Sequence, residues 1–141
     1  MEHHRKLERM YAMAPINRFF APRLTIGEGT AEVCIDVHEA FHHTAGAMHG
    51  AVYFKALDDA AFFAANSIVE GVFVLTAQFE VEFLKPVIQG EIRAHGRVVS
   101  ETGRRIEAEA ELFDSEGVLV GRGRGTFARS QVELAPSIHY A

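Results

Sequence analysis

The chain has 141 residues and a net charge of −5, which favours one domain with a sizeable core and argues against a general nucleic-acid binder. Its one cysteine, Cys34, excludes an internal disulfide, and the alternating pattern around it indicates a reduced core thiol. The N-terminal residues lack the continuous apolar core of a signal peptide, and charged residues interrupt the longest apolar stretch. These features predict a soluble cytoplasmic protein that does not enter a membrane.

The first half of the chain predicts two helices and two strands. Residues 2–13 place apolar side chains at helical spacing among charged ones, which predicts a short amphipathic helix. Residues 18–28 predict a first strand, and residues 31–37 predict a second because apolar and polar residues alternate. From Gly50 to about Ser67 a helix would be apolar on nearly every face, so it must be surrounded by protein.

The second half of the chain predicts β structure. Residues 73–83 alternate strictly, with Leu75 and Phe79 on one face and Thr76 on the other. Three further strands follow, with hairpin turns at 101–103 and 114–117; these strands are predicted at residues 91–100, 105–113 and 118–128. We expect the tail from Val132 to be loose.

The order of these elements is helix, two strands, long helix and four strands. It lacks the alternation of strands and helices that builds a parallel sheet. We therefore predict an α+β fold in which one antiparallel sheet surrounds the long helix. Residues 1–141 would form a single domain whose core spans about residues 15–129.

Two aspartates, Asp58 and Asp59, lie in the middle of the apolar helix. Burying a carboxylate is costly unless it is paired, protonated or used in chemistry. This conflict indicates a functional site. The alternative for Asp58 is a buried ion pair, either with Lys55 three residues earlier or with an arginine such as Arg93 or Arg97.

Several motifs follow one another in an order typical of a known family. They are the loop His43-x-x-Gly46-x-x-His49-Gly50-Ala51, then Leu57-Asp58 on the helix, then Thr76 and the strand end Phe83-Leu84-Lys85-Pro86. Over roughly residues 15–129 the chain resembles the hotdog-fold thioesterases, particularly the PaaI-like acyl-CoA thioesterases of phenylacetate degradation. The resemblance implies a sheet wrapped around a central helix, and assembly into homodimers or homotetramers.

The resemblance also implies an activity, the hydrolysis of an acyl-CoA thioester to a free acid and CoA, with no metal or other cofactor. Asp58 matches the family's acidic residue nine positions after the loop histidine, and would act as base or nucleophile. Thr76 matches the position beside the water or thioester, and the alternative for it is an ordinary outward-facing threonine of a strand. Two residues depart from the family's Asn-x-x-Gly-x-x-His-Gly-Gly loop, because His43 replaces the Asn and Ala51 replaces the second Gly.

The start of the long helix offers what a developing oxyanion needs, namely free N–H groups and a positive dipole end. We assign the Gly50 N–H as the donor, with His49 positioning this turn or the carbonyl. Nine helical residues rotate by about 900° and rise about 13 Å, so His49 and Asp58 would point apart on one helix. They can converge only across two chains, which predicts active sites at a dimer interface.

CoA carries several phosphate charges and therefore needs local cations. The candidates are Lys85, Arg104, Arg105, Arg122 and Arg124. Glycines flank the last two and give the backbone freedom, and both would share one face of a strand. The alternative for each cation is a solvated strand edge that blocks aggregation. Most phenylalanines of the helix and the following strand are assigned to the core, with Tyr53 or Phe54 as candidates for lining the acyl slot.

Two other functions stay open at this point. His38, His42, His43 and His49 crowd one loop, and three imidazoles with a carboxylate could hold Zn²⁺ in a metal-dependent hydrolase. No His-x-x-x-His pair lies on a helix, so we expect no metal site. The other alternative is a hotdog protein that binds acyl-CoA or another small ligand without turnover, which the His43 departure keeps open.

Overall fold

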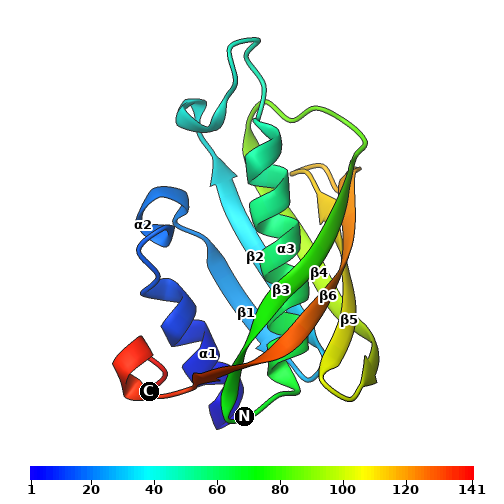
Figure 1. The fold of residues 1–141 in the computed structure, drawn as a ribbon. Helices are drawn as coiled ribbons and strands as arrows, with labels where there is room; N and C mark the ends of the chain where they lie inside the picture. The colour runs from blue at the N-terminus through cyan, green and yellow to red at the C-terminus, as the bar shows by residue number, and fades with distance from the viewer.

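The computed structural model describes residues 1–141, whose helices and strands are shown in Figure 1. The α-helices are α1 (Glu2–Ala12), α2 (Asn17–Phe20) and α3 (Gly50–Ser67). The strands are β1 (Arg23–Gly27), β2 (Thr30–Val37), β3 (Val72–Phe83), β4 (Gly90–Thr102), β5 (Arg105–Phe113) and β6 (Leu119–Glu133). Two short 3-10 turns, η1 (Glu39–Phe41) and η2 (Pro136–Ile138), complete the chain.

The six strands form one antiparallel sheet in the order β1-β2-β4-β5-β6-β3. The sheet curves around α3, which runs along its inner face (Figure 1). This arrangement confirms the predicted α+β class and the sheet around a long helix. Strands β1 and β3 are the two free edges of the sheet, so the outer side of the 12-residue strand β3 has no neighbouring strand in the chain.

Helix α3 is enclosed over most of its length, with 12 of its 18 residues buried. Small residues let it approach the sheet closely, because a Cβ atom at Gly96 in β4 would overlap the carbonyl oxygen of Ala60. The least covered stripe of α3 contains Ala51, Phe54 and Asp58, spaced three and four residues apart. None of the helices combines the length and the apolar character that a membrane crossing requires.

Three glycines of β6 make room for aromatic rings. Gly121, Gly123 and Gly125 are buried on the inner face of the sheet. A Cβ atom at Gly123 or Gly125 would overlap the ring of Phe79, and one at Gly121 would lie 3.3 Å from Tyr53. The sequence analysis linked these glycines to a phosphate-facing edge, whereas the structure gives them a packing role.

A β-bulge in strand β3 corrects the predicted strict alternation. The pairing of β3 with β6 shifts after Thr76, so that Ala77 is an extra residue with no counterpart in β6. Before the bulge Val74 is fully buried, whereas Leu75 is half exposed. The bulge reverses the parity of the strand and puts Thr76 on the same side as Phe79, toward α3.

The predicted strand at residues 18–28 is helical at its start. Helix α2 ends at Phe20, the next residue Ala21 has a left-handed backbone with φ 47°, and β1 begins only after this reversal. The apolar side chains that suggested a strand pack instead as an aromatic cluster, in which the Phe20 and Phe41 ring centroids are 5.3 Å apart. The predicted helix at residues 2–13 is confirmed as α1.

The tail expected to be loose from Val132 is docked. Strand β6 continues past this residue, and the Leu134 N–H donates to the Gly71 carbonyl at 2.9 Å. The Tyr140 hydroxyl lies 2.7 Å from Nδ1 of the buried His3 in α1. The two chain ends therefore lie side by side near the C-terminal end of α3 (Figure 1).

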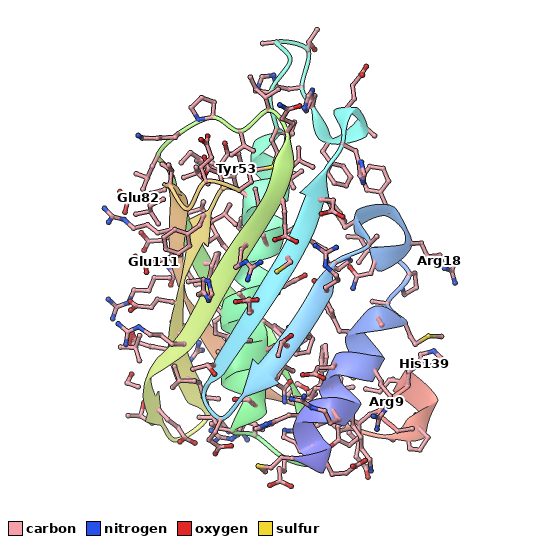
Figure 2. The ribbon with its side chains drawn as sticks, turned by 180° about the vertical axis from the view of Figure 1, so that it is seen from behind. Arg9, Arg18, Tyr53, Glu82, Glu111 and His139 are labelled. Atoms are coloured by element: carbon pink, nitrogen blue, oxygen red, sulfur yellow. The ribbon has the colours of Figure 1, made fainter.

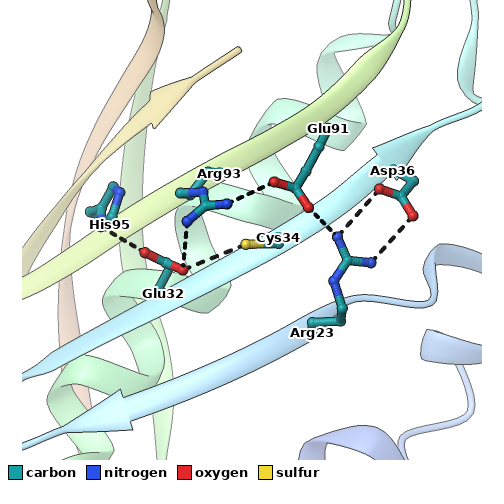
Figure 3. A network of polar contacts seen from close by, with 7 residues as sticks. All are labelled: Arg23, Glu32, Cys34, Asp36, Glu91, Arg93 and His95. Atoms are coloured by element: carbon teal, nitrogen blue, oxygen red, sulfur yellow. Dashed lines mark hydrogen bonds and ion pairs between the residues drawn. The ribbon is translucent and has the colours of Figure 1, made fainter. Parts of the chain in front are cut away.

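The outer face of the sheet, on the side away from α3, carries rows of polar and charged side chains, including the labelled Glu82 and Glu111 (Figure 2). Figure 3 shows one network of these side chains across β1, β2 and β4. Its members are Arg23, Glu32, Asp36, Glu91, Arg93 and His95, joined by ion pairs of 2.6–3.3 Å. The outer face is thus a surface of paired charges.

Cys34 is free and buried, as predicted, but its side chain lies in this network on the outer face of the sheet and not in the apolar cluster between sheet and helix (Figure 3). Its thiol is 3.6 Å from the Glu32 carboxylate. Burial raises the pKa of the Cys34 thiol to about 11. The thiolate is therefore scarce at neutral pH, so Cys34 does not supply a nucleophile.

Candidate active site

The candidate oxyanion donor lies at the first turn of α3, which begins at Gly50. His49 caps the helix, because its Nδ1 accepts the Ala51 N–H at 2.9 Å. The Gly50 N–H has no hydrogen-bond partner within the chain, so it is free to bind a ligand. Since Nδ1 is the acceptor, neutral His49 carries its proton on Nε2. The side chain of His49 thus fixes the turn that presents the Gly50 N–H.

The loop before α3 is held by hydrogen bonds of its own. The Ala45 N–H donates to Nδ1 of His43 at 3.1 Å, and the Gly46 N–H donates to the His43 carbonyl at 3.0 Å. Gly46 has a φ of 88°, a left-handed conformation that glycine adopts readily. A side-chain acceptor that bonds the N–H two residues later is also what asparagine provides in a turn. The side chain of His43 therefore supports this turn in the way that an asparagine side chain can.

Asp58 lies on the least covered stripe of α3, beside the bulge in β3. The Thr76 hydroxyl donates to Asp58 Oδ1 at 3.0 Å. Burial, followed by the charge of Asp59, raises the pKa of Asp58 from its ordinary 3.8 to about 6, while the Thr76 hydrogen bond and Lys55 oppose this rise. At pH 7 such a carboxyl group is mostly ionised and yet more basic than an ordinary aspartate, which suits a general base.

Asp59, the next residue, makes its contacts with other side chains. Its Oδ2 accepts from Lys55 Nζ at 2.6 Å and from the Tyr11 hydroxyl at 2.5 Å. The ion pair that Lys55 could have made with Asp58 is therefore made with Asp59. The sequence analysis did not identify Tyr11, which α1 brings to this site across 48 residues of chain.

The arginines considered as partners for Asp58 lie elsewhere. Arg93 bonds Glu91 at 2.8 Å and Glu32 at 3.3 Å, and Arg97 pairs with Glu109, all on the outer face of the sheet. Asp58 therefore has no direct cationic partner in the chain. The buried ion pair proposed as an alternative for Asp58 is not formed.

The five candidate phosphate-binding cations fall into two groups. Arg122 bonds Glu82 at 2.8 Å and Arg124 bonds Glu107 at 3.4 Å, which fits the solvated, paired edge considered as the alternative. Of these five, Lys85, Arg104 and Arg105 are exposed and have no ion pair.

The unpaired cations lie at opposite ends of the sheet. Lys85 follows β3 near the start of α3, where the Tyr53 hydroxyl donates to its carbonyl oxygen at 2.7 Å. Arg104 and Arg105 lie at the β4–β5 turn, near the opposite end of α3 (Figure 1). In one chain, therefore, only Lys85 lies near the free Gly50 N–H.

Phe83 forms an apolar wall at the start of α3. A Cβ atom at Gly50 would lie 3.2 Å from the Phe83 ring, and this ring also packs edge-on against Tyr53 with centroids 5.3 Å apart. Phe83 is 58% exposed, which corrects its assignment to the core, and Phe54, a candidate for lining the acyl slot, is 41% exposed. The strand end Phe83-Leu84-Lys85-Pro86 was the sequence signal for this wall.

The four loop histidines do not gather into a metal site. His42 Nε2 lies 2.7 Å from the Ile88 carbonyl, while His38 packs against Phe41 with ring centroids 5.5 Å apart. Nδ1 of His43 and of His49 each accepts a backbone N–H. No group of three or more His, Cys, Asp and Glu side chains in the chain is arranged to hold a metal ion.

Comparison with known proteins connects this geometry to a family. Residues 45–121 match the sequence model of the thioesterase superfamily. This span includes the helix start, Asp58 and Thr76. The chain belongs to the thioesterase superfamily. A Sulfurisphaera tokodaii protein named as a candidate esterase is 32% identical over 101 residues, which cover 71% of this chain and 74% of that protein.

Solved structures share the fold of this thioesterase-superfamily member. The Escherichia coli PaaI protein from the phenylacetic acid degradation operon superimposes with a TM-score of 0.83 at 20% identity, covering 94% of this chain and 99% of that one. A conserved Pseudomonas aeruginosa protein gives a TM-score of 0.79 at 26% identity, covering 86% and 98%. These likenesses confirm the hotdog fold and are consistent with the PaaI-like type.

The structure of this superfamily member separates the candidate groups into two sets. His49 and the Gly50 N–H lie together at the helix start, and Asp58 and Thr76 lie together on the helix stripe beside β3. Eight helical residues separate Gly50 from Asp58, a rise of about 12 Å along the axis. One chain therefore holds a donor and a base that are too far apart to act on the same carbonyl group.

Proposed function

We propose that this chain is an acyl-CoA thioesterase in which Asp58 acts as base or nucleophile. The observation that carries this proposal is the state of Asp58, a carboxyl group with a pKa of about 6 whose Oδ1 is oriented by the Thr76 hydroxyl. Its occurrence in a chain of the thioesterase superfamily connects that carboxyl group to thioester hydrolysis. The reaction needs no metal or cofactor other than the CoA of the substrate.

As a base, Asp58 accepts a proton from water while the water oxygen bonds to the thioester carbonyl carbon. The carbonyl oxygen becomes an oxyanion and accepts the Gly50 N–H. When the oxyanion collapses, the C–S bond breaks, the acid is released, and the CoA sulfur leaves as a thiolate that takes up a proton. As a nucleophile, the Asp58 carboxylate would instead attack the carbonyl carbon, and the C–S bond would break to release the CoA thiolate and leave a mixed anhydride. Water would then hydrolyse the anhydride to the free acid and restore Asp58.

The donor and the base of one site come from two copies of the chain in this proposal. Gly50 and Asp58 of one chain are separated along α3, so a donor and a base that act on one carbonyl group must come from two copies. The free edge of β3 supports it, because an unpaired 12-residue strand is a template for antiparallel pairing with a second copy. Phe54 on the uncovered stripe of α3 and Leu75 on β3 are apolar and exposed, as expected of surfaces that a second copy covers.

The acyl group and the CoA would contact different surfaces. The exposed ring of Phe83 beside Gly50 offers an apolar wall to the acyl group. Lys85, two residues later, is the unpaired cation nearest to this helix start and is our candidate for a CoA phosphate. Arg104 and Arg105 could serve the same CoA only if a second copy carries them to this end of the sheet.

The proposal is tested by thiol release from a panel of acyl-CoAs that includes phenylacetyl, benzoyl, and short and long aliphatic groups. We expect wild type to hydrolyse at least one of them with chelator present, and Asp58→Asn to lose about 10²-fold or more. Full activity of Asp58→Asn would contradict the role of this residue. A wild type that binds CoA but releases no thiol would favour the alternative function, a hotdog protein that binds acyl-CoA without turnover.

A further inference from the structure

A polar cluster of three side chains lies next to Asp58, between α1 and α3. Asp59 Oδ2 accepts both from Lys55 Nζ, at 2.6 Å, and from the Tyr11 hydroxyl, at 2.5 Å. Nζ of Lys55 also lies 5.0 Å from the centroid of the Tyr11 ring and 5.5 Å from that of Phe20. The three side chains thus hold one another in a fixed geometry.

The cluster is shielded from water and its charges balance. The side chain of Lys55 is 11% exposed and that of Asp59 is 17% exposed, so solvent screens their charges far less than those of a surface ion pair. One cation and one anion give a net charge of zero. Burial raises the pKa of Tyr11 well above its usual range, so its phenol remains a neutral donor to Asp59.

The charges of Asp59 and Lys55 act on the proton affinity of the neighbouring Asp58. Asp59 and Lys55 act on it from α3, the Tyr11 phenol lies beside it on α1, and β3 contributes the uncharged Thr76 hydroxyl. The charge of Asp59 disfavours an ionised Asp58, whereas the charge of Lys55 favours it. Removing the charge of Asp59 would therefore lower the proton affinity of Asp58, and removing the charge of Lys55 would raise it.

We propose that Tyr11, Lys55 and Asp59 are positioning residues that set the pH at which Asp58 becomes an active base. Tyr11 and Lys55 hold the Asp59 carboxylate in place, and the positive charge of Lys55 offsets part of the effect of Asp59 on Asp58. The N-terminal helix α1 takes part in the chemistry indirectly, because it supplies Tyr11. This inference rests on the proposed role of Asp58.

The test is a titration of the Asp58 carboxyl group by ¹³C NMR in the full chain, with the signal assigned by its loss in Asp58→Asn. We expect the wild-type midpoint near pH 6. Asp59→Asn should lower the midpoint by about one pH unit, and Lys55→Met should raise it by less, because Lys55 is the weaker of the two influences on Asp58. The double variant removes both charges and should titrate between the two single variants and below wild type, even if Lys55→Met alone folds poorly.

Two further variants sharpen the test. Tyr11→Phe removes a hydrogen bond to Asp59 without removing a charge, so the shift it causes should be smaller than that of Asp59→Asn. Glu116→Gln removes an exposed charge in the β5–β6 turn and should leave the Asp58 midpoint unchanged. Midpoints of Asp59→Asn and Lys55→Met that equal wild type, or that move in the same direction, would overturn the inference.

The titration needs no turnover, so it separates this inference from the proposed function. If wild type hydrolyses acyl-CoA, the acid limb of the kcat/KM profile should shift with the NMR midpoint in each variant. If wild type hydrolyses nothing, the proposed function fails while the titration still tests the charge balance. If hydrolysis occurs and neither midpoint nor pH profile moves, only the inference fails.

Discussion

The Gly50 N–H can be removed with little other change to the chain. Proline is well accepted at the first helical position, and His49 already has the extended backbone (φ −64°, ψ 145°) that must precede a proline. We expect Gly50→Pro to lower kcat for thiol release by about 10²- to 10³-fold, since it deletes an oxyanion donor. The matched control is Gly50→Ala, which keeps the N–H and places a similar Cβ atom against Phe83. An equal loss in both variants would indicate crowding and contradict the donor role.

Ionised Asp58 should lower the free energy of unfolding at neutral pH. The pKa of Asp58 is raised from 3.8 to about 6, so folding disfavours its ionised form. This ionised form dominates above pH 6 and lowers the stability of the fold there. The loss of stability disappears as the pH falls below about 4, where the carboxyl group is protonated in both the folded and the unfolded chain. We therefore expect Asp58→Asn to raise the free energy of unfolding at pH 7 by about 1–2 kcal/mol, with the gain shrinking steadily from pH 6 to pH 4. Urea unfolding at several pH values measures it. A gain that does not depend on pH would contradict this account.

The sequence indicates Asp58 because a carboxylate in a wholly apolar helix conflicts with its surroundings. The sequence does not indicate how Asp58 is oriented. Thr76 was predicted on the opposite face from Phe79, and only the bulge at Ala77 brings it toward α3. Tyr11 leaves no local signal, because its contact with α3 depends on how α1 packs on the finished sheet.

At the scale of elements, the position of α3 depends on glycines of the sheet. We expect Gly96→Ala to destabilise the chain by about 2–3 kcal/mol, because its Cβ atom would overlap the Ala60 carbonyl, a backbone atom that cannot move without displacing the helix. Urea unfolding at pH 7 provides the measurement. Gly121→Ala is the matched control on the neighbouring inner face, where the nearest contacts are 3.3 Å away and a smaller loss is expected. Equal losses of unfolding free energy in the two variants would contradict the close packing of α3 against β4.

Elements with a regular pattern or a long apolar run were predicted well, and irregular ones were not. Strand β2 alternates between apolar and polar residues, whereas helix α3 is apolar on nearly every face and was indicated by the length of its apolar run. The predicted bounds of both agree with the structure. Helix α2 has four residues, too few for a helical period to show, so its apolar run suggested a strand. The C-terminal tail is ordered by contacts with Gly71 and His3, which are distant in sequence.

At the scale of the whole molecule, one chain contains all the strands of the sheet but not all the groups of one proposed active site. The hotdog fold follows from the order of predicted elements together with the family motifs, and the comparisons confirm it. The site pairs Gly50 of one copy with Asp58 of another in our proposal, and the free edge of β3 offers the surface for that pairing.

Mixing two inactive variants tests this central claim most directly. Gly50→Pro keeps Asp58, and Asp58→Asn keeps the Gly50 N–H, so a mixed dimer contains one intact site and one that lacks both groups. After unfolding and joint refolding of equal amounts, half of the dimers are mixed, and we predict recovery of about a quarter of wild-type thiol release. A mixture as inactive as either variant alone, with mixed dimers demonstrated by mass spectrometry, would contradict a site built from two chains.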